Sequence, residues 1–258
     1  MEEFIKEITK EAGKAVLKIY GMVGHEYTKG NIADVVTKAD LLASKILIDS
    51  IKEKYPDHGI ISEEEDDHNI DAEYTWIIDP LDGSRNFSTR TPLFGVMVAL
   101  AHRGELELAA IYNPIQDELF FAKKGSGAFR NGEKIHCSET KEFEHCYGVC
   151  LAAFTSPRRI ETVLNLVKYA YKEIFWFNQF GNVSISVAMV ADGRRDWYFS
   201  GGKTPWDYAA GALLLKESGC IVTDLKGEPW KIGSVGLVAA NKYLHSKLLS
   251  IINNQKVI

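Results

Sequence analysis

Two aspartates, a glycine and a hydroxyl follow an apolar run in the segment WIIDPLDGSRNF, residues 76–87. Asp79 and Asp82 are three residues apart across a turn that contains Pro80, so both carboxylates can face one point in space. A carboxylate at the end of a buried strand costs free energy unless a cation or several donors meet it. Gly83 leaves backbone N–H groups open to an anion. Carboxylates beside an anion site predict a metal ion between them, and hard oxygen ligands favour Mg2+ or Mn2+.

Two other segments place acid at the end of a predicted element. A short apolar strand over residues 60–62 runs into Glu63, Glu64 and Glu65. The segment TPWDYAAG, residues 204–211, sets Asp207 at the start of a predicted helix. Three distant parts of the chain therefore offer carboxylates that folding could bring together.

These segments resemble the signatures of the inositol monophosphatase family, which are a Glu-Glu pair, Asp-Pro-x-Asp-Gly-Ser/Thr-x-Asn-Phe and Trp-Asp-x-Ala-Ala-Gly. All three occur in the family's order, and the resemblance extends from about Lys29 to Asn241. It implies an α+β fold, a layered αβαβα sandwich of the sugar-phosphatase type. It also implies a Mg2+-dependent, lithium-sensitive phosphomonoesterase.

The resemblance implies ligands for two metal ions. Glu63, Asp79 and the Leu81 carbonyl would hold the first ion, and Asp79, Asp82 and Asp207 would hold the second. In two-metal phosphoryl transfer one ion activates water and the other stabilises the leaving oxygen. We therefore expect Mg2+ at two or three positions per site, with Mn2+ as a substitute.

The acidic run continues beyond Glu63, and such runs are usually solvated surface. We keep Glu64 as a candidate for a third, loosely held ion and assign Glu65 to the surface. Lys29 matches a family lysine in a mobile loop that approaches the metals, although Lys29-Gly30-Asn31 also fits an ordinary polar turn.

Ser84 stands at the family position that orients the attacking water, where threonine is commoner. The resemblance pairs Asp40 with this hydroxyl, so Asp40, Ser84 and Glu63 form the predicted catalytic set. Asp40 has a second candidate role, because Thr37-Lys-Ala-Asp40 has the order of a helix capping box, and the two roles can coexist. We predict that Asp82, Gly83 and Ser84 meet the substrate phosphate at the start of a short helix.

Substrate choice depends on other positions. Animal-type members of the family carry a substrate-binding glutamate seven residues before the aspartate of Trp-Asp, and that position here is Ser200. Basic residues that could meet a second phosphate, each also consistent with solvated surface charge, are Lys203, Arg158, Arg159 and either Arg194 or Arg195. As a group they resemble the cations of archaeal enzymes that accept both inositol 1-phosphate and fructose 1,6-bisphosphate. These two compounds are the predicted substrates.

Several alternatives stay open at this stage. A nucleotide 3′-phosphatase or an NADP phosphatase would belong to the same family. Haloacid-dehalogenase-like phosphatases use a nucleophilic aspartate two residues before a second aspartate, whereas Asp79 and Asp82 are three apart, which argues against that class. A non-catalytic sugar-phosphate-binding protein need not keep carboxylates that repel phosphate without a metal.

Composition narrows the classes of partner. The net charge of −5 argues against nucleic-acid binding through a general basic surface. No apolar run approaches the ~18 to 20 residues that cross a bilayer, and the first residues lack the order of a secretion signal. We therefore expect a cytoplasmic protein with no nucleic-acid or membrane partner, acting on a small phosphorylated metabolite. The family resemblance implies a homodimer.

The four cysteines, Cys137, Cys146, Cys150 and Cys220, fit no zinc spacing with the histidines. Buried thiols are the favoured interpretation. Cys146 and Cys150 are close enough in sequence for a redox pair, which geometry could equally prevent.

Hydrophobic periodicity predicts the elements that carry these residues. In the first half we expect helices over 4–19 and 38–55, a polar loop over 25–33, strands that end at the two acidic segments, and an antiparallel meander over 94–102, 105–112 and 118–123. After a glycine-rich connection over 125–132 we expect a helix over 157–172, helices from Val183, Trp206 and Lys242, and strands over 175–177, 197–199, 220–223 and 236–240. This pattern predicts an α+β metal-binding subdomain with an antiparallel sheet over 1–135 and an α/β substrate-side subdomain over 136–258, together forming one family unit.

Overall fold

A computed structural model of the chain describes residues 1–22, 25–28, 35–151, 157–173 and 176–253. Side chains are described for all of these except 25–28, 35–36, 157–159 and 173. The α-helices in these residues are α1 (Glu2–Ile19), α2 (Lys38–Lys54), α3 (Ser84–Ser88), α4 (Pro157–Glu173), α5 (Ser184–Ala191), α6 (Pro205–Glu217) and α7 (His245–Ile252).

The described strands form three sheets. A seven-stranded sheet has the order β3 (Gly59–Ser62), β4 (Tyr74–Asp82), β5 (Gly95–His102), β6 (Glu105–Asn113), β7 (Glu118–Lys123), β8 (Gly127–Arg130) and β9 (Glu133–Ile135). A five-stranded sheet has the order β11 (Trp176–Asn178), β10 (Tyr147–Leu151), β12 (Trp197–Ser200), β14 (Leu237–Ala240) and β13 (Ile221–Thr223). A small antiparallel pair joins β1 (His25–Thr28) and β2 (Val35–Thr37).

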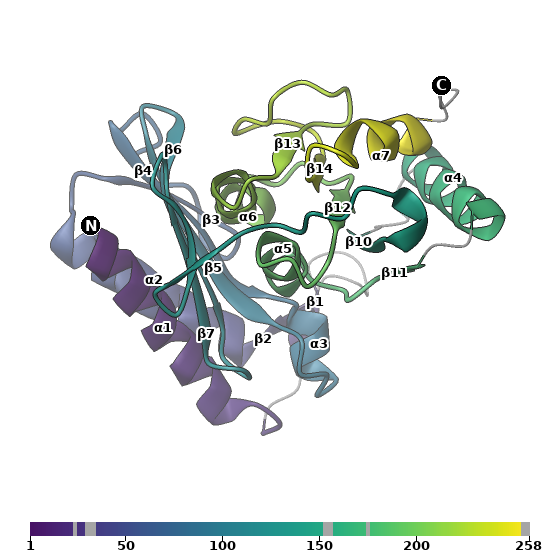
Figure 1. Ribbon diagram of the computed structural model, residues 1–258. Coiled ribbons are helices and arrows are strands. Elements are labelled where there is room, and N and C mark those ends of the chain that lie inside the picture. The colour runs from purple at the N-terminus through teal and green to yellow at the C-terminus, as the bar shows by residue number, and fades with distance from the viewer. Residues whose placement is uncertain (23–24, 29–34, 152–156, 174–175, 254–258) are drawn as a thin grey trace.

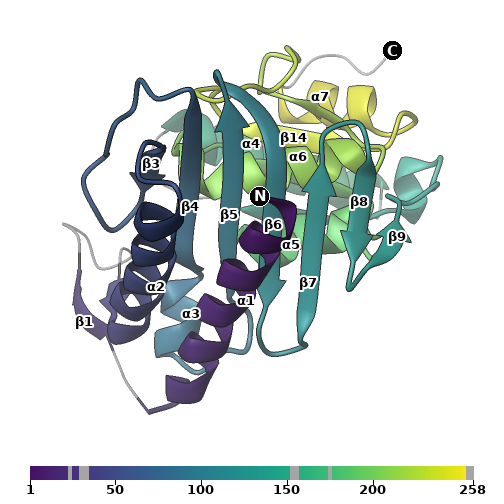
Figure 2. The same ribbon diagram turned by 90° about the vertical axis from the view of Figure 1, so that its left-hand side faces the viewer.

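The elements stack in five layers, which is the αβαβα sandwich that the family resemblance implies. Helices α1 and α2 cover one face of the seven-stranded sheet (Figure 2). Helices α5 and α6 lie between the two large sheets, and α4 and α7 cover the far face of the five-stranded sheet (Figure 1).

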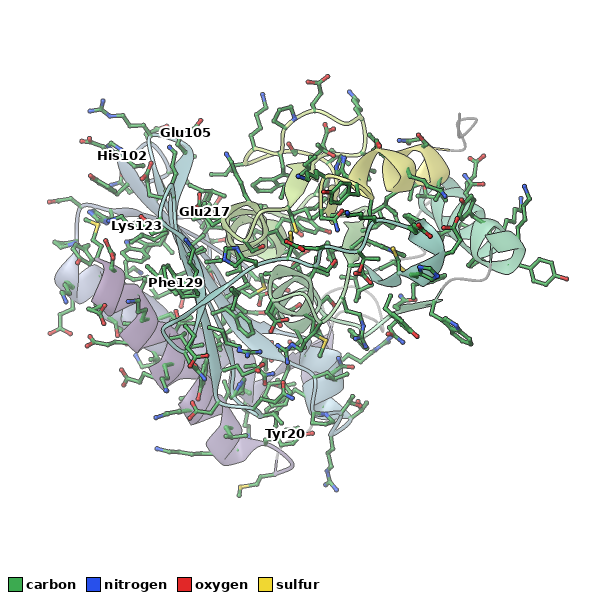
Figure 3. The ribbon with its side chains drawn as sticks, in the orientation of Figure 1. Tyr20, His102, Glu105, Lys123, Phe129 and Glu217 are labelled. Atoms are coloured by element: carbon green, nitrogen blue, oxygen red, sulfur yellow. The ribbon has the colours of Figure 1, made fainter. Side chains whose placement is uncertain are left out.

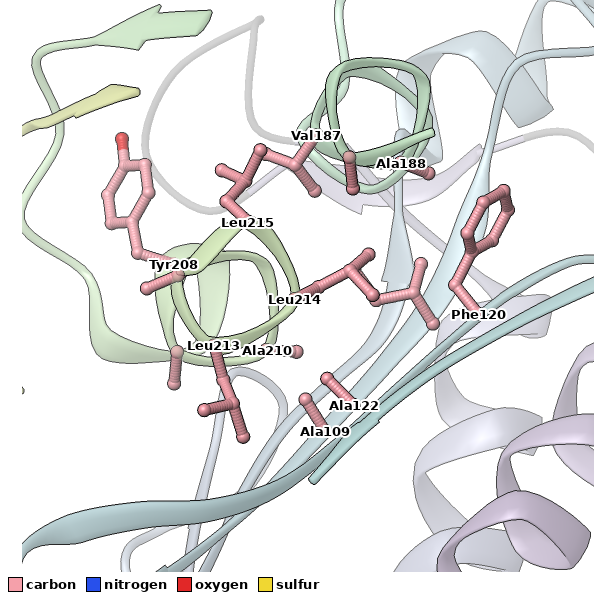
Figure 4. Packing of buried hydrophobic residues seen from close by; sticks show 14 of the residues in the cluster. Ala109, Phe120, Ala122, Val187, Ala188, Tyr208, Ala210, Leu213, Leu214 and Leu215 are labelled. Carbon is pink, nitrogen blue, oxygen red and sulfur yellow. The ribbon is translucent and has the colours of Figure 1, made fainter. Parts of the chain in front are cut away.

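Three buried clusters correspond to the spaces between these layers. The largest packs α5 and α6 against the seven-stranded sheet, with Leu213 and Leu214 of α6 facing small residues such as Ala109 and Ala122 (Figure 4). The second lies under α1 and α2, and the third lies under α4 and α7. The space between the sheets is thus filled, so a site can form only where the loops at their edges meet.

The predicted elements of the first half are mostly confirmed. Helix α1 buries Phe4, Ile8, Ala12 and Val16, as the helical spacing requires. Helix α2 begins with the predicted capping box. The Thr37 side chain accepts from a backbone N–H of the first turn, and the Asp40 side chain accepts from the Thr37 backbone N–H. The meander forms β5, β6 and β7 with antiparallel pairing.

Some expectations were wrong. The loop predicted over residues 25–33 contains a strand at its start, because β1 pairs with β2. The connection over 125–132 contains β8, where the glycines permit tight turns between short strands. Pairing of β3 with β4 is parallel, so the first sheet is mixed. Helix α7 begins at His245, three residues later than predicted. The division of the chain at residue 135 stays a prediction.

In the part of the chain that the structure describes, no helix is long and apolar enough to cross a membrane.

Candidate active site

Asp79 is the centre of the acidic cluster. It lies near the end of β4 and is 1% exposed. The pairing of β4 with β5 shifts register between Asp79 and Asp82, at Pro80, which has no N–H for the ladder. Burial raises the pKa of Asp79 well above its ordinary value, and the negative charges of Glu63, Asp82, Asp207 and Asp40 raise it further, in that order. The three acidic segments therefore meet at this one side chain.

Asp40 is fixed by donors from two segments. One oxygen accepts from the Thr37 amide at 2.7 Å and the Thr37 hydroxyl at 2.6 Å, and the other accepts a short hydrogen bond from the Ser84 hydroxyl. The Ser84 hydroxyl also lies 2.8 Å from the Leu81 carbonyl oxygen. Burial raises the pKa of Asp40, and these hydrogen bonds oppose the rise. The structure thus places Asp40 in the capping box and beside Ser84 at once.

Asp82 is held by the N-terminus of α5. Its carboxylate accepts from the Val183 amide at 2.9 Å and the Ser184 amide at 2.6 Å, and also from the Ser184 hydroxyl. Burial raises the pKa of Asp82, while the Ser184 hydroxyl and both amides lower it. Sequence analysis missed Val183 and Ser184, because a contact across about a hundred residues leaves no local signal.

Asp207 sits in the first turn of α6. Its carboxylate accepts a short hydrogen bond from the hydroxyl of Thr204, the residue that precedes the helix. Trp206, expected to pack in the core, lies partly buried against the largest cluster. Sequence analysis did not assign Thr204, although Thr-x-x-Asp before a helix is a visible signal.

The turn after β4 requires glycine. Gly83 has φ +90°, and a Cβ there would lie 2.9 Å from the Leu93 carbonyl oxygen. It precedes α3, whose first amides have no acceptor inside the helix. Asn86 of α3 donates 2.8 Å hydrogen bonds to the carbonyls of Leu93 and Phe180, which ties the turn to the segment before α5.

The donor set has the chemistry of a Mg2+ or Mn2+ site, since the charged side chains that raise the pKa of Asp79 are all carboxylates and hard cations prefer oxygen ligands. Among the described residues, however, no three Asp, Glu, His or Cys side chains lie in an arrangement that could hold an ion as they stand. The hydrogen bonds of Asp82 to α5 and of Asp207 to Thr204 give a physical reason, because both carboxylates are oriented by protein donors. The residues therefore fit a cation in charge and ligand type.

The structure describes only some of the other predicted residues. Glu63 and Glu64 are partly buried directly after β3, whereas Glu65 is exposed. Lys203 is exposed in the segment before α6. Lys29 lies outside the described residues, and Arg158 and Arg159 begin α4 with side chains outside the described part.

Ser200 and Arg194 have structural partners. Ser200 is buried at the end of β12, with its hydroxyl 2.7 Å from the Tyr208 hydroxyl. Arg194 bonds Asp192 and Glu118, and its role at a second phosphate stays a prediction. Arg195 donates to the carbonyl of Arg194.

All four cysteines are free thiols. Burial raises the pKa of Cys146 to about 12 and that of Cys150 to about 11. Both therefore stay protonated near neutral pH, which disfavours the redox pair considered from their spacing.

Comparison with known proteins agrees with this geometry. The sequence pattern of the inositol monophosphatase family matches residues 1–256. The Nus factor SuhB of Escherichia coli K12 is 35% identical over 93% of this chain and 91% of that protein. The fructose-1,6-bisphosphatase/inositol-1-monophosphatase of Thermotoga maritima is 30% identical over 97% of this chain and 95% of that protein.

A solved structure gives the same picture of the fold. The extragenic suppressor protein SuhB from Bartonella henselae superposes with a TM-score of 0.91 at 31% identity, covering 99% of this chain and 98% of that chain. Fold, motif order and full-length similarity agree, and this chain belongs to the inositol monophosphatase family.

Proposed function

We propose that this protein is a Mg2+-dependent phosphomonoesterase that hydrolyses small sugar or polyol phosphates. One observation carries the proposal: four carboxylates from four segments of the chain, Glu63, Asp82, Asp207 and Asp40, raise the pKa of Asp79 by their charge. The Ser84 hydroxyl donates to one of them, Asp40. Such a concentration of negative charge is unfavourable by itself and is relieved by divalent cations. When bound, Mg2+ would supply Lewis-acid activation of water and charge neutralisation for phosphate.

The residues of the chain supply the rest of the mechanism. Because the Ser84 hydroxyl donates to Asp40, the serine oxygen keeps a lone pair for a hydrogen bond from the attacking water. As that water gives its proton to the Ser84 oxygen, the Ser84 hydroxyl proton passes to the Asp40 carboxylate. The amides of Gly83 and Ser84, at the start of α3, face the phosphate in this proposal. Attack by water leaves no phosphorylated enzyme, and covalent phosphate on Asp79 or Asp82 would contradict it.

A metal requirement tests the proposal directly. Phosphate release should need Mg2+ or Mn2+ and should disappear in excess EDTA, since carboxylates alone cannot activate water enough. Full activity in EDTA would remove the metal mechanism. Inhibition by millimolar lithium is expected from the family. Its absence would weaken the placement of the protein within the family and would not change the fold.

Ser200 supports the choice of substrate. A glutamate at this position would accept hydrogen bonds from inositol hydroxyls, but the Ser200 hydroxyl is buried against Tyr208. Exposed Lys203 lies three residues later, before Asp207. We propose that fructose 1,6-bisphosphate is hydrolysed at its 1-phosphate at least as efficiently as inositol 1-phosphate. A panel with these two compounds, a nucleoside 3′-phosphate and NADP, with released phosphate as the readout, would rank the alternatives.

A non-catalytic role stays the competing hypothesis, because similar chains bear the name Nus factor SuhB. The absence of a nucleic-acid partner therefore stays a prediction. Calorimetric binding of fructose 1,6-bisphosphate without turnover at saturating Mg2+ would favour the binding protein. Turnover lost on Asp79→Asn would favour the enzyme.

The outer face of α4 supports a homodimer. Ile160, Leu164, Val167 and Tyr171 follow helical spacing and are 38%, 48%, 46% and 90% exposed. A helix face this apolar usually has a partner. Leu164→Glu should reduce the mass measured by light scattering from that of two chains to that of one, while leaving the fold intact. Two chains in this variant, or one in the parent, would contradict the proposal.

A further inference from the structure

A second cavity lies at the other end of α6 from Asp207. It has a volume of about 510 Å3 and is bounded by the start of β6, the C-terminal half of α6, β13 and residues 229–232. Figure 3 labels Glu105, which lies on its rim at the tip of the β5–β6 hairpin. This volume falls within the range of about 300 to 1,000 Å3 that is common for small-molecule sites.

The cavity is basic in a chain of net negative charge. Its charged lining consists of Lys124, Lys216, Lys231 and Glu105. Lys124 is neutralised by Glu107 at 3.0 Å and Glu105 at 3.9 Å. In the described part of the chain, neither Lys216 nor Lys231 forms an ion pair, so two cations remain available to an anion.

A buried donor without an acceptor adds an independent observation. The indole N–H of Trp230 is buried, and no described group accepts its hydrogen bond. Trp230 is held in place, since its amide donates to the Val222 carbonyl at 3.2 Å and Pro229 bridges to Thr223. Unsatisfied buried donors are uncommon in folded proteins and call for an explanation. Trp230 lines the cavity, and an acceptor on a bound molecule would provide that explanation once the buried N–H turns toward that space.

The rest of the lining is apolar. Leu213 of α6, Val222 of β13 and Ile232 face the cavity together with the Trp230 ring. Such walls favour a flat hydrophobic body, whereas a hydrophilic sugar would lose its hydration there.

Another, larger cavity offers a contrast. It measures about 660 Å3 and lies between α1 and β7. There Lys123 is 2.6 Å from Glu2 and Lys10 is 3.2 Å from Asp117, so these cations are already paired. The two cavities therefore differ in whether their lysines are paired.

We propose that the cavity at the C-terminal half of α6 binds a small organic anion that carries a flat hydrophobic ring and a hydrogen-bond acceptor. The anionic group would meet Lys216 and Lys231, the ring would contact Leu213 and Val222, and the acceptor would bond the Trp230 indole. This site is separate from the carboxylate cluster, which contacts α6 only through its first turn.

Fluorescence titration of the full chain with 8-anilinonaphthalene-1-sulfonate tests the site, with N-phenyl-1-naphthylamine as the uncharged probe of the same shape. We expect one saturable sulfonate site, about tenfold weaker in Lys216→Ala and in Lys231→Ala, because each removes a charge-assisted contact. Lys52→Ala, an exposed lysine on α2, is the matched control and should leave the affinity unchanged. Trp230→Phe keeps a ring, removes the N–H and should weaken binding about threefold.

Three outcomes would overturn the proposal. These are no saturable binding of the sulfonate, equal affinity for the two probes, or an unchanged affinity in the Lys216→Ala/Lys231→Ala double variant. Thermal melting of each variant shows that it is folded. The lysine variants keep the test valid even if Trp230→Phe is unstable, because both lysines are exposed.

Discussion

Helices α2 and α6 begin with the same pattern, Thr37-Lys-Ala-Asp40 and Thr204-Pro-Trp-Asp207, and both aspartates act on Asp79. The two helix starts differ in how they hold the acid. Asp40 is 2% exposed and closes a capping box with the Thr37 backbone. Asp207 is partly buried and accepts from the Thr204 hydroxyl, which makes no cap of its own. The same pattern thus gives two different carboxylates. Asp40 is fixed and can position Ser84, whereas the hydroxyl partner of Asp207 can rotate away for a cation.

Asp79→Asn should have the largest effect on activity, because it removes the carboxylate with which both Asp40 and Asp207 interact. We expect a loss of kcat/KM on the order of 10³-fold or more in phosphate release at saturating Mg2+. Glu65→Gln, an exposed neighbour in the acidic run, is the control and should change activity little. Equal losses in both variants would mean that the wrong acids were assigned.

Ser84→Ala would test the α2 side alone. Asp40 would keep its hydrogen bonds to Thr37 but lose the Ser84 hydroxyl, which links it to the attacking water in the proposed mechanism. We expect kcat to fall on the order of 10²-fold or more, with the Mg2+ dependence of activity and the calorimetric Mg2+ affinity unchanged. A weakened Mg2+ affinity would instead make Ser84 part of the metal site.

The pH dependence of the free energy of unfolding compares the acidic cluster with Asp79 charged and with Asp79 protonated. The pKa of Asp79 is raised in the folded state, so above about pH 4 the folded chain holds a proton that the unfolded chain has lost. Without metal, the free energy of unfolding should therefore fall as pH rises, by at most about 1.4 kcal/mol per pH unit for this proton, until the folded pKa is passed.

Urea unfolding in EDTA at pH 5 and pH 7 measures this slope. Subtracting the free energy of unfolding of Asp79→Asn from that of the parent removes the contribution of the histidines. Their lowered pKa values act on stability in the opposite direction. A difference that does not change with pH would contradict the raised pKa. Added Mg2+ should abolish the slope, because the cation replaces the proton.

Lys203 lies directly before Thr204, just before α6 begins. Its replacement tests whether this side of the site selects the substrate. Lys203→Ala should lower kcat/KM for fructose 1,6-bisphosphate about tenfold and leave inositol 1-phosphate unaffected, because only the bisphosphate carries a second phosphate. Equal losses on both substrates would indicate a structural role.

The smallest expected difference is between the two threonines. Thr37→Ala removes a hydroxyl that accepts from the Ala39 amide, and should lower the free energy of unfolding by about 1 kcal/mol. Thr204→Ala removes no cap and should change stability less. Thermal melting in EDTA compares them, and a greater loss in Thr204→Ala would reverse the interpretation of the two helix starts.

Local patterns explain what the sequence could predict. The helical spacing of Phe4 to Val16, the Thr37 capping box and the glycine turn at Gly83 each depend on neighbours within a few residues, and all three occur in the structure. The gathering of three acidic segments could be expected only through family resemblance.

Long-range contacts explain what could not be predicted. The bond between Ser200 and Tyr208 turns the expected substrate position inward, and it depends on how β12 meets α6. Strands β8 and β9 are short strands at one end of the sheet, where β8 pairs with β7 and β9 pairs with β8, and this pairing depends on the neighbouring strand more than on their own composition.

The contact of Asp82 with α5 has a consequence for synthesis of the chain. Its donors, Val183 and Ser184, follow it by 101 and 102 residues. At about 5 to 20 residues per second, a ribosome needs roughly 5 to 20 s to produce them. During that interval the first sheet can form only with Asp82 in water or protonated, so the β4 end is the last part of that sheet to settle.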